Sequence, residues 1–176
     1  AAAALAGAPD RTRLWAMIET CRAVLNLPII AARATGTRLQ ALVAGTNDLA
    51  KDMDCRPAPD RAPLLPALAQ IVMAARSHGL LAIDGVYNAL EDVEGLAAEA
   101  TQGRRFGFHG KSLIHPSQIE AANAAFSPSA EELRWARAVV SAFADPANAS
   151  AGVLRVEGRM VERLHLEEAR ALLARG

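Results

Sequence analysis

Residues 39–50 read LQALVAGTNDLA, and residues 14–20 upstream read LWAMIET. Each stretch is a short apolar run that ends near a carboxylate, Asp48 in the first and Glu19 in the second. Apolar runs of about five or six residues bounded by polar residues and glycine are typical of strands buried on both faces, as in a parallel sheet. Ligands bind at the carboxyl ends of such strands, so both acids are candidates for chemistry. The alternative is that each acid only caps the helix that follows its strand.

Composition and charge favour a globular protein that acts on a small molecule. The chain has 176 residues, of which 52% are hydrophobic, and a formal net charge of +0, which suits one domain with a substantial core. No basic run is interleaved with aromatic residues, and no apolar stretch approaches the roughly 20 residues that span a bilayer. We therefore expect neither nucleic acid nor a membrane as a partner. Cys21 and Cys55 form no CxxC pair, which fits a reducing cytoplasm.

Strand and helix patterns alternate four times along residues 14–126. Apolar runs predict strands at 14–20, 39–45, 80–83 and, more weakly because of two glycines, 106–111. Helical spacing and proline positions predict two short helices in 21–34, then helices from residue 64 to Gly79, over 92–102 before Gly103, and over 117–126. Residues 51–63, with three prolines among charged residues, read as a surface loop. This alternation predicts an α/β fold with a parallel sheet.

The two ends of the chain have different patterns. Residues 1–10 read as the tail of a helix, so we expect the chain to start in the middle of a larger fold. Ser129 and Glu132 form a capping box before a helix over 131–143, and a flexible connector follows at 145–152. VLRV and RMV around Glu157 and Gly158 predict a hairpin, and a last helix is expected over 166–175.

Several motifs in order carry a family resemblance. AMIET, GTNDLA, AIDGVY and GFHGKSLIHPSQI are followed by FSPSAEELRWARAVVSAF and EGRMVE. Together, from about residue 14 onward, they resemble the citrate lyase β-subunit-like CoA-ester lyases of the HpcH/HpaI aldolase superfamily. The resemblance implies a TIM-type (β/α)8 barrel with a C-terminal helix-hairpin-helix extension, and these motifs look like strands five to eight. Because such a barrel needs about 250 residues, we expect the first four strands, and an arginine that holds the oxo acid, to be missing here.

The resemblance also implies domains and site residues. Residues 1–144 would be a partial barrel, and residues 145–176 an extension that covers a neighbouring subunit's active site in a homotrimer or homohexamer. Glu19 and Asp48 match the family's two Mg²⁺ ligands. Residues implied to contact the substrate are Glu19, Asn47, Asp48, Ile114 and His115. For His115 the alternative is a side chain that only orients the helix start before Pro116.

The implied reaction is Mg²⁺-dependent cleavage of a 3-hydroxyacyl-CoA, of the malyl-CoA, methylmalyl-CoA or citramalyl-CoA type, to an acyl-CoA and a 2-oxo acid. Glu162 of GRMVE stands where many family members have an aspartate that transfers a proton, so it is the catalytic candidate. The longer side chain leaves open whether the enzyme is a lyase or a thioesterase, and Glu162 could also be a surface residue. Two further alternatives are an aldolase acting on a free hydroxy-oxo acid and a non-catalytic half-barrel that binds another protein.

Overall fold

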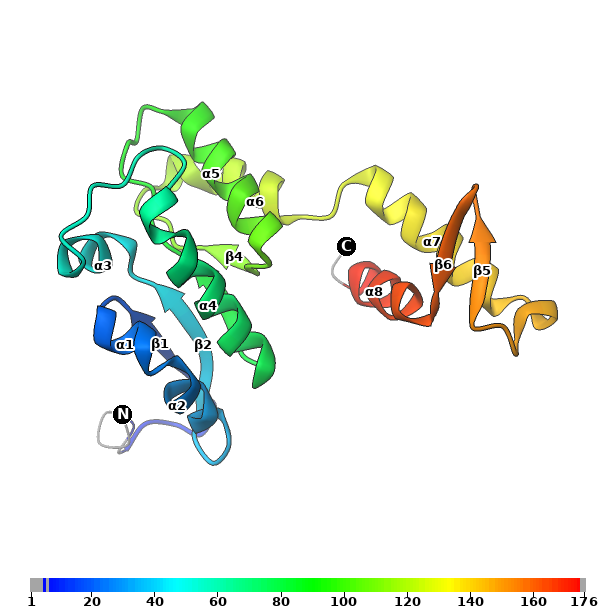
Figure 1. Ribbon diagram of the computed structural model, residues 1–176, viewed down its shortest axis with the longest axis horizontal. Coiled ribbons are helices and arrows are strands. Elements are labelled where there is room, and N and C mark those ends of the chain that lie inside the picture. Colours follow the sequence, from blue (N-terminus) through cyan, green and yellow to red (C-terminus); the bar gives the residue numbers. More distant parts are fainter. Residues whose placement is uncertain (1–4, 6, 175–176) are drawn as a thin grey trace. The chain divides into compact units, whose positions relative to one another are not determined.

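The computed structural model describes residue 5 and residues 7–174, and the chain divides into two compact units between Phe126 and Ser127 (Figure 1). The helix tail that we expected within residues 1–10 falls partly outside the described residues. The division lies earlier than the predicted boundary after residue 144. The reason is that the helix preceding that boundary shares a core with the hairpin and the last helix.

The first unit is built on a four-stranded parallel sheet, which confirms the predicted α/β class. Its strands lie in chain order, β1 (Leu14–Ile18), β2 (Leu39–Ala44), β3 (Leu81–Asp84) and β4 (Gly110–Lys111). The fourth strand is shorter than the predicted 106–111, because residue 106 still belongs to a helix. Crossovers between parallel strands are right-handed, so strands in simple chain order have their connecting helices on one face.

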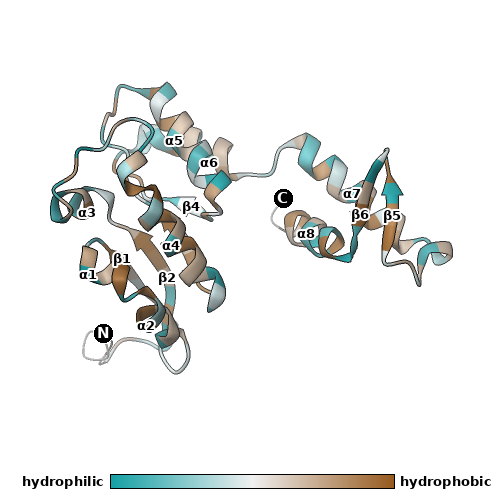
Figure 2. Ribbon diagram, in the orientation of Figure 1, coloured by the Kyte–Doolittle hydropathy of each residue, from teal (hydrophilic) through white to brown (hydrophobic). Residues whose placement is uncertain are grey.

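Helices cover that face. In order they are α1 (Cys21–Leu25), α2 (Leu27–Ala31), α3 (Thr46–Asp52), α4 (Leu65–Ser77), α5 (Val93–Phe106) and α6 (Ile119–Phe126), with short 3-10 turns at Ala32–Ala34, Ala62–Leu64 and Pro116–Gln118. In α4, Leu68 and Ile71 are fully buried in the same core as Leu42 of β2. β2 is hydrophobic along most of its length, as its central place in the sheet requires (Figure 2).

Glycine ends α5 later than the sequence predicted. The helix continues through Gly103 and ends at Gly107, whose φ of 98° is the left-handed conformation that glycine adopts without strain. Gly103 is instead a packing position: a Cβ atom there would lie 2.5 Å from Oδ2 of Asp84. Glycine inside a helix costs free energy. At position 103 the missing side chain allows α5 to approach the end of β3.

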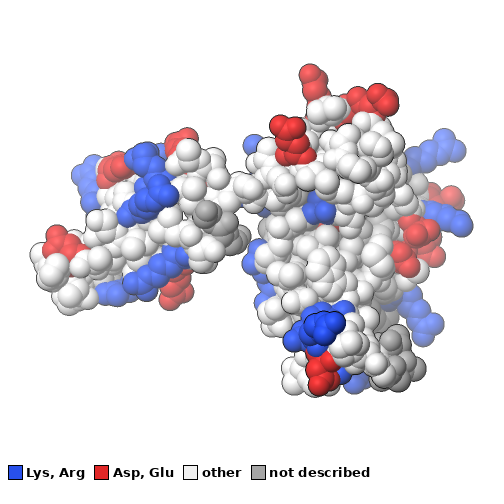
Figure 3. Space-filling model, turned by 180° about the vertical axis from the view of Figure 1, so that it is seen from behind, with Lys and Arg blue, Asp and Glu red and all other residues white. Residues whose placement is uncertain are grey.

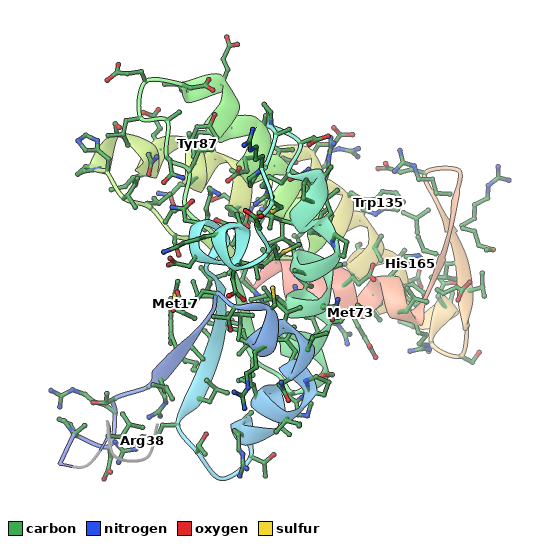
Figure 4. All side chains as sticks on the ribbon, turned by 60° about the vertical axis from the view of Figure 1, so that its left-hand side comes forward. Met17, Arg38, Met73, Tyr87, Trp135 and His165 are labelled. Carbon is green, nitrogen blue, oxygen red and sulfur yellow. The ribbon has the colours of Figure 1, made fainter. Side chains whose placement is uncertain are left out.

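The other face of the sheet carries no helix of the first unit. Trp15 and Met17 of β1 alternate with the core-facing residues of that strand, and each is 51% exposed. Met17 and Met73 of α4 point outward on different sides of the unit (Figure 4). Seen from behind, the middle of the unit shows few charged side chains (Figure 3). Within the described residues the sheet is open, with β1 and β4 at its two edges.

The second unit has its own hydrophobic core. It contains α7 (Ala130–Ala144), β5 (Val153–Val156), β6 (Arg159–Glu162) and α8 (Arg163–Leu173), and a 3-10 turn, Pro146–Asn148, lies in the predicted connector. The hairpin is confirmed, and Glu157 and Gly158 both have the positive φ of a tight hairpin turn. The Ser129 capping box is also present. The last helix begins at Arg163, earlier than predicted, and residues 175–176 lie outside the described part.

None of the helices in the described residues is long and apolar enough to cross a membrane.

Candidate functional site

Glu19 directly follows β1, and its side chain lies against Gly45 at the end of β2. The Gly45 N–H donates to the Ile18 carbonyl at 2.9 Å, so the ends of the two strands are neighbours. A Cβ atom on Gly45 would lie 2.4 Å from Cβ and 3.0 Å from Oε2 of Glu19. Any larger residue at position 45 would therefore displace the Glu19 carboxylate.

Asp48 lies in the first turn of α3, for which Gly45 is the N-cap. It is thus inside a helix rather than in the loop directly after the strand. Residues three positions apart on a helix lie next to each other on its surface. Asp48 is three positions after Gly45, the glycine that Glu19 contacts. A negative charge in the first turn is also favoured by the helix dipole.

Neither acid acts as a helix cap. Thr20 caps α1 by accepting the Ala23 N–H at 3.1 Å, and α3 has no side-chain cap. Among the described residues, neither Glu19 nor Asp48 takes part in an ion pair. Glu19 is half-buried and Asp48 exposed, so both carboxylates are accessible. The capping alternative is therefore wrong for both residues.

The two carboxylates suit a hard cation. No group of three or more His, Cys, Asp and Glu side chains able to hold a metal occurs in residue 5 or residues 7–174. Mg²⁺ needs only one or two protein carboxylates, because substrate and water fill its other positions. The bare Cα of Gly45 allows the Glu19 side chain to lie against the end of β2, three residues before Asp48.

Asn47, the residue before Asp48, joins two loops. Its side chain exchanges two hydrogen bonds with Asn88, at 3.1 and 2.8 Å. The two asparagines line a cleft together with Thr46, Arg61 and Tyr87. The Asn47 side chain thus ties the start of α3 to the loop after β3.

A buried group of charges lies at the end of β3. Asp84 is fully buried, and its two carboxylate oxygens accept hydrogen bonds from Nη1 of Arg61 at 2.8 and 3.0 Å. Lys111 Nζ donates to Glu99 at 2.5 Å and to the Gly85 carbonyl at 2.6 Å. Through Arg61, Asp84 holds the end of the loop that follows α3.

Lys111 is buried, although lysine side chains are usually solvated. Its side chain has no exposed surface. Its ammonium lies within 3.6 Å of Asp84 as well as beside Glu99. Nothing in the sequence identified Arg61 and Glu99 as its companions, because they come from a loop and a helix far apart in the chain.

His115 caps a helix start, as the alternative interpretation predicted. Its Nδ1 accepts the Ser117 N–H at 3.2 Å, which leaves the proton of a neutral ring on Nε2. Ile114 beside it is 52% exposed, and its N–H donates to the buried side chain of Gln118. Gln118 in turn donates to the Tyr87 carbonyl at 2.8 Å and so connects this segment to the loop after β3.

Tyr87 is held at the start of α5. Its hydroxyl donates to Asp92 at 2.6 Å, and this bond raises the pKa of Tyr87 to about 12. The same bond, with the Gly95 N–H, lowers the pKa of Asp92. Tyr87 is labelled in Figure 4.

Glu162, the catalytic candidate, lies in the second unit. It is the last residue of β6 and the N-cap of α8, and its N–H donates to Nδ1 of His165 at 2.9 Å. In the hairpin register it pairs with Val153, which is 53% exposed. Val161, on the opposite face, is buried in the core of the unit. Glu162 therefore projects from the face of the hairpin that turns away from that core.

The order of the motifs and the fold are matched by comparison with known proteins. Residues 2–116 match the family model described as HpcH/HpaI aldolase/citrate lyase. The chain belongs to this family.

Proteins similar to this chain include one that is named for its action on a CoA ester. A (3S)-malyl-CoA thioesterase of Cereibacter sphaeroides is 49% identical over 162 residues, covering 92% of this chain and 56% of that protein. The citrate lyase subunit beta of Leuconostoc mesenteroides is 35% identical, covering 86% of this chain and 50% of that protein. The chain therefore spans about half the length of these relatives.

A solved structure of the family shows the same fold. CitE of Mycobacterium tuberculosis, in complex with magnesium, acetoacetate and coenzyme A, is 32% identical and superimposes with a TM-score of 0.78. The match covers 94% of this chain and 61% of that chain.

Proposed function

We propose that the protein containing this chain is a Mg²⁺-dependent carbon-carbon lyase that cleaves a 3-hydroxyacyl-CoA to an acyl-CoA and a 2-oxo acid. The observation that carries the proposal is the pair of accessible carboxylates, Glu19 and Asp48, near the ends of adjacent parallel strands, neither of which forms an ion pair with another described residue. The magnesium in the related CitE complex supports the metal.

We further propose that the first unit is the second half of a (β/α)8 barrel. Its four parallel strands lie in chain order with helices on one face, as consecutive strands of a barrel do. The apolar exposed side chains Trp15 and Met17 would then face the barrel interior, and the open edges of β1 and β4 would pair with four further strands. An arginine for the oxo acid's carboxylate would come from that other half.

The residues of the chain have distinct roles in this proposal. Glu19 and Asp48 would hold Mg²⁺, which when bound would supply Lewis-acid stabilisation of the oxo acid. Cleavage requires loss of the 3-hydroxyl proton, rupture of the bond between C3 and the α carbon (C2) of the thioester, and delivery of a proton to that α carbon. Asn47, Ile114 and His115 would contact the substrate around this centre.

Glu162 would transfer the proton to the α carbon of the thioester. Its place on the outward face of the hairpin, beside exposed Val153 and Met160, supports a role in covering the site of a neighbouring subunit. Apolar side chains on an exposed sheet face are typical of surfaces that meet another protein. We therefore keep a homotrimer or homohexamer as the proposed assembly.

A second candidate function is hydrolysis of the thioester. The 49% identity to a protein named (3S)-malyl-CoA thioesterase favours it. The proposed active site can serve both reactions, because the Glu162 carboxylate that exchanges a proton with the α carbon can also accept a proton from the attacking water.

The products distinguish the two reactions. The full-length protein is incubated with (3S)-malyl-CoA and Mg²⁺, and the release of a 2-oxo acid and of a free thiol are measured separately. Lyase activity produces the oxo acid without free CoA, whereas hydrolysis produces free CoA without the oxo acid. Glu19→Gln and Asp48→Asn should abolish either activity, and Glu91→Gln, which changes an exposed acid in a loop of the same unit, should not. Full activity in chelator-treated protein would refute the metal-dependent mechanism.

A further inference from the structure

The start of α3 rests on Gly85, the residue after β3. A Cβ atom at position 85 would lie 2.4 Å from Oγ1 and 2.6 Å from Cγ2 of Thr46, and 3.0 Å from the Ala44 carbonyl. Thr46 is the first residue of α3 and is 8% exposed. The helix that carries Asp48 is thus packed against a bare Cα, with no space for another atom.

Gly85 is itself fixed on both of its polar groups. Its N–H donates to Oδ1 of Asp84 at 2.8 Å, and its carbonyl accepts from Nζ of Lys111 at 2.6 Å. Both partners have fully buried side chains. The surface against which Thr46 packs is therefore a rigid one.

The segment that follows α3 returns to the same place. Arg61 lies at the end of the loop after α3, and its guanidinium binds both oxygens of Asp84. Arg61 adopts a φ of 56°, a conformation that costs free energy for a residue other than glycine. The start of α3 is therefore held by Gly85, and the end of the loop that follows α3 is held by the neighbouring Asp84.

We propose that Gly85 is a positioning residue for Asp48: it sets the place of α3, and so the place of the metal ligand relative to Glu19. The inference rests on the proposed function only in naming Asp48 as a metal ligand. A displacement of a few tenths of an ångström matters there, because Mg²⁺ demands near-ideal octahedral geometry with bonds of about 2.0–2.1 Å.

Gly85→Ala tests the contact, because Gly85 does not have a positive φ and alanine changes only the packing. The added methyl must displace Thr46, whose β-branched side chain is stiff at χ1. Thr46→Ala removes both side-chain atoms in the way, so the double variant Gly85→Ala/Thr46→Ala should regain most of what Gly85→Ala loses. Gly107→Ala is the matched control. It adds a methyl group to another glycine of the same unit, one with a positive φ at the C-terminal end of α5, so it should strain the backbone there.

Two measurements on the full-length protein decide the matter: Mg²⁺ affinity by titration calorimetry and amide hydrogen exchange of α3. We expect Gly85→Ala to weaken Mg²⁺ binding at least tenfold and to speed exchange in α3, and the double variant to reverse both effects. Gly107→Ala should lower thermal stability while Mg²⁺ affinity stays within twofold of the wild type.

Unchanged exchange in Gly85→Ala would overturn the inference, as would faster exchange with unchanged Mg²⁺ affinity. Failure of Thr46→Ala to rescue would do the same, because the effect would then not pass through this contact. A wild-type protein that binds no Mg²⁺ would refute the proposed function and the metal role of Asp48. The exchange data would still decide whether Gly85 holds α3.

Discussion

Asp84→Asn should be among the most destabilising single-atom changes in the first unit. Asp84 has no exposed surface, and its carboxylate accepts from Arg61 twice and from the Gly85 N–H. It also lies 3.6 Å from Lys111. The substitution removes one of two negative charges in a group whose other members are Arg61, Lys111 and Glu99, so it leaves a buried positive charge without compensation.

The structure sets the size of the effect. Breaking a buried ion pair by removing one partner costs about 3–5 kcal/mol. Nη2 of Arg61 is buried and has no hydrogen-bond partner among the described residues. The guanidinium therefore depends on the bonds that Nη1 and Nε make. After the change it keeps the Gln102 side chain at 2.8 Å and Glu99 at 3.7 Å. We therefore expect a loss near the middle of that range.

The first unit offers a control at the same distance. Asp10 pairs with Arg38 at 2.8 Å, equal to the Asp84–Arg61 distance, but the Asp10 side chain is fully exposed. Exposed pairs contribute little, so Asp10→Asn should have no clear effect. The assay is urea unfolding of both variants, followed by circular dichroism and by the combined fluorescence of Trp15 and Trp135. If Asp84→Asn costs no more than Asp10→Asn, burial does not govern the strength of these pairs and the reasoning is wrong.

Three further predictions concern other parts of the chain. Tyr87 is the single tyrosine, so absorbance titration should give a midpoint at about 12 in the folded protein, and Asp92→Asn should lower it toward 10. Because the pKa of Tyr87 is raised, its contribution to stability is complete below pH 10 and is lost as the pH rises through about 12. The pKa of Asp92 is lowered, so its contribution to stability is complete above the ordinary aspartate pKa and is lost as the pH falls through the pKa of Asp92 in the folded protein. Ser129→Ala should cost about 1 kcal/mol in unfolding of the second unit, and a change below 0.3 kcal/mol would mean that the capping box does not hold α7. Glu162→Ala in the full-length protein should reduce turnover by about 10²- to 10⁴-fold with Mg²⁺ affinity unchanged, and unaltered turnover would remove Glu162 from the mechanism.

The strands and most helices were predictable because local pattern and tertiary role agree. The buried run of β2 and the periodic face of α4 each have one stable arrangement. The end of α5 was mispredicted because Gly103 is a strong breaker by local preference, while its packing on Asp84 is a long-range fact. The unit boundary was mispredicted for a similar reason, since the sequence of α7 does not specify which core it joins.

The candidate site rests on short motifs that the sequence shows directly. Glu19 and Asp48 follow apolar runs, and parallel pairing of those runs brings Glu19 against Gly45, three residues before Asp48. The buried charges of Arg61 and its neighbours were not predictable, because the sequence around Arg61 is typical of a surface loop, whereas the folded chain buries its side chain. Glycines directly after strands, such as Gly85, were the one sequence feature that could have marked the close approaches.

Separate cores also bear on how this protein can vary between lineages. Residues 127–129 connect α6 to α7, and each side of that link buries its own apolar residues. Segments with independent cores can be exchanged by recombination at such a link without opening either interior. The segment with Glu19 and Asp48 and the segment with Glu162 can thus be exchanged independently of each other without disturbing either core.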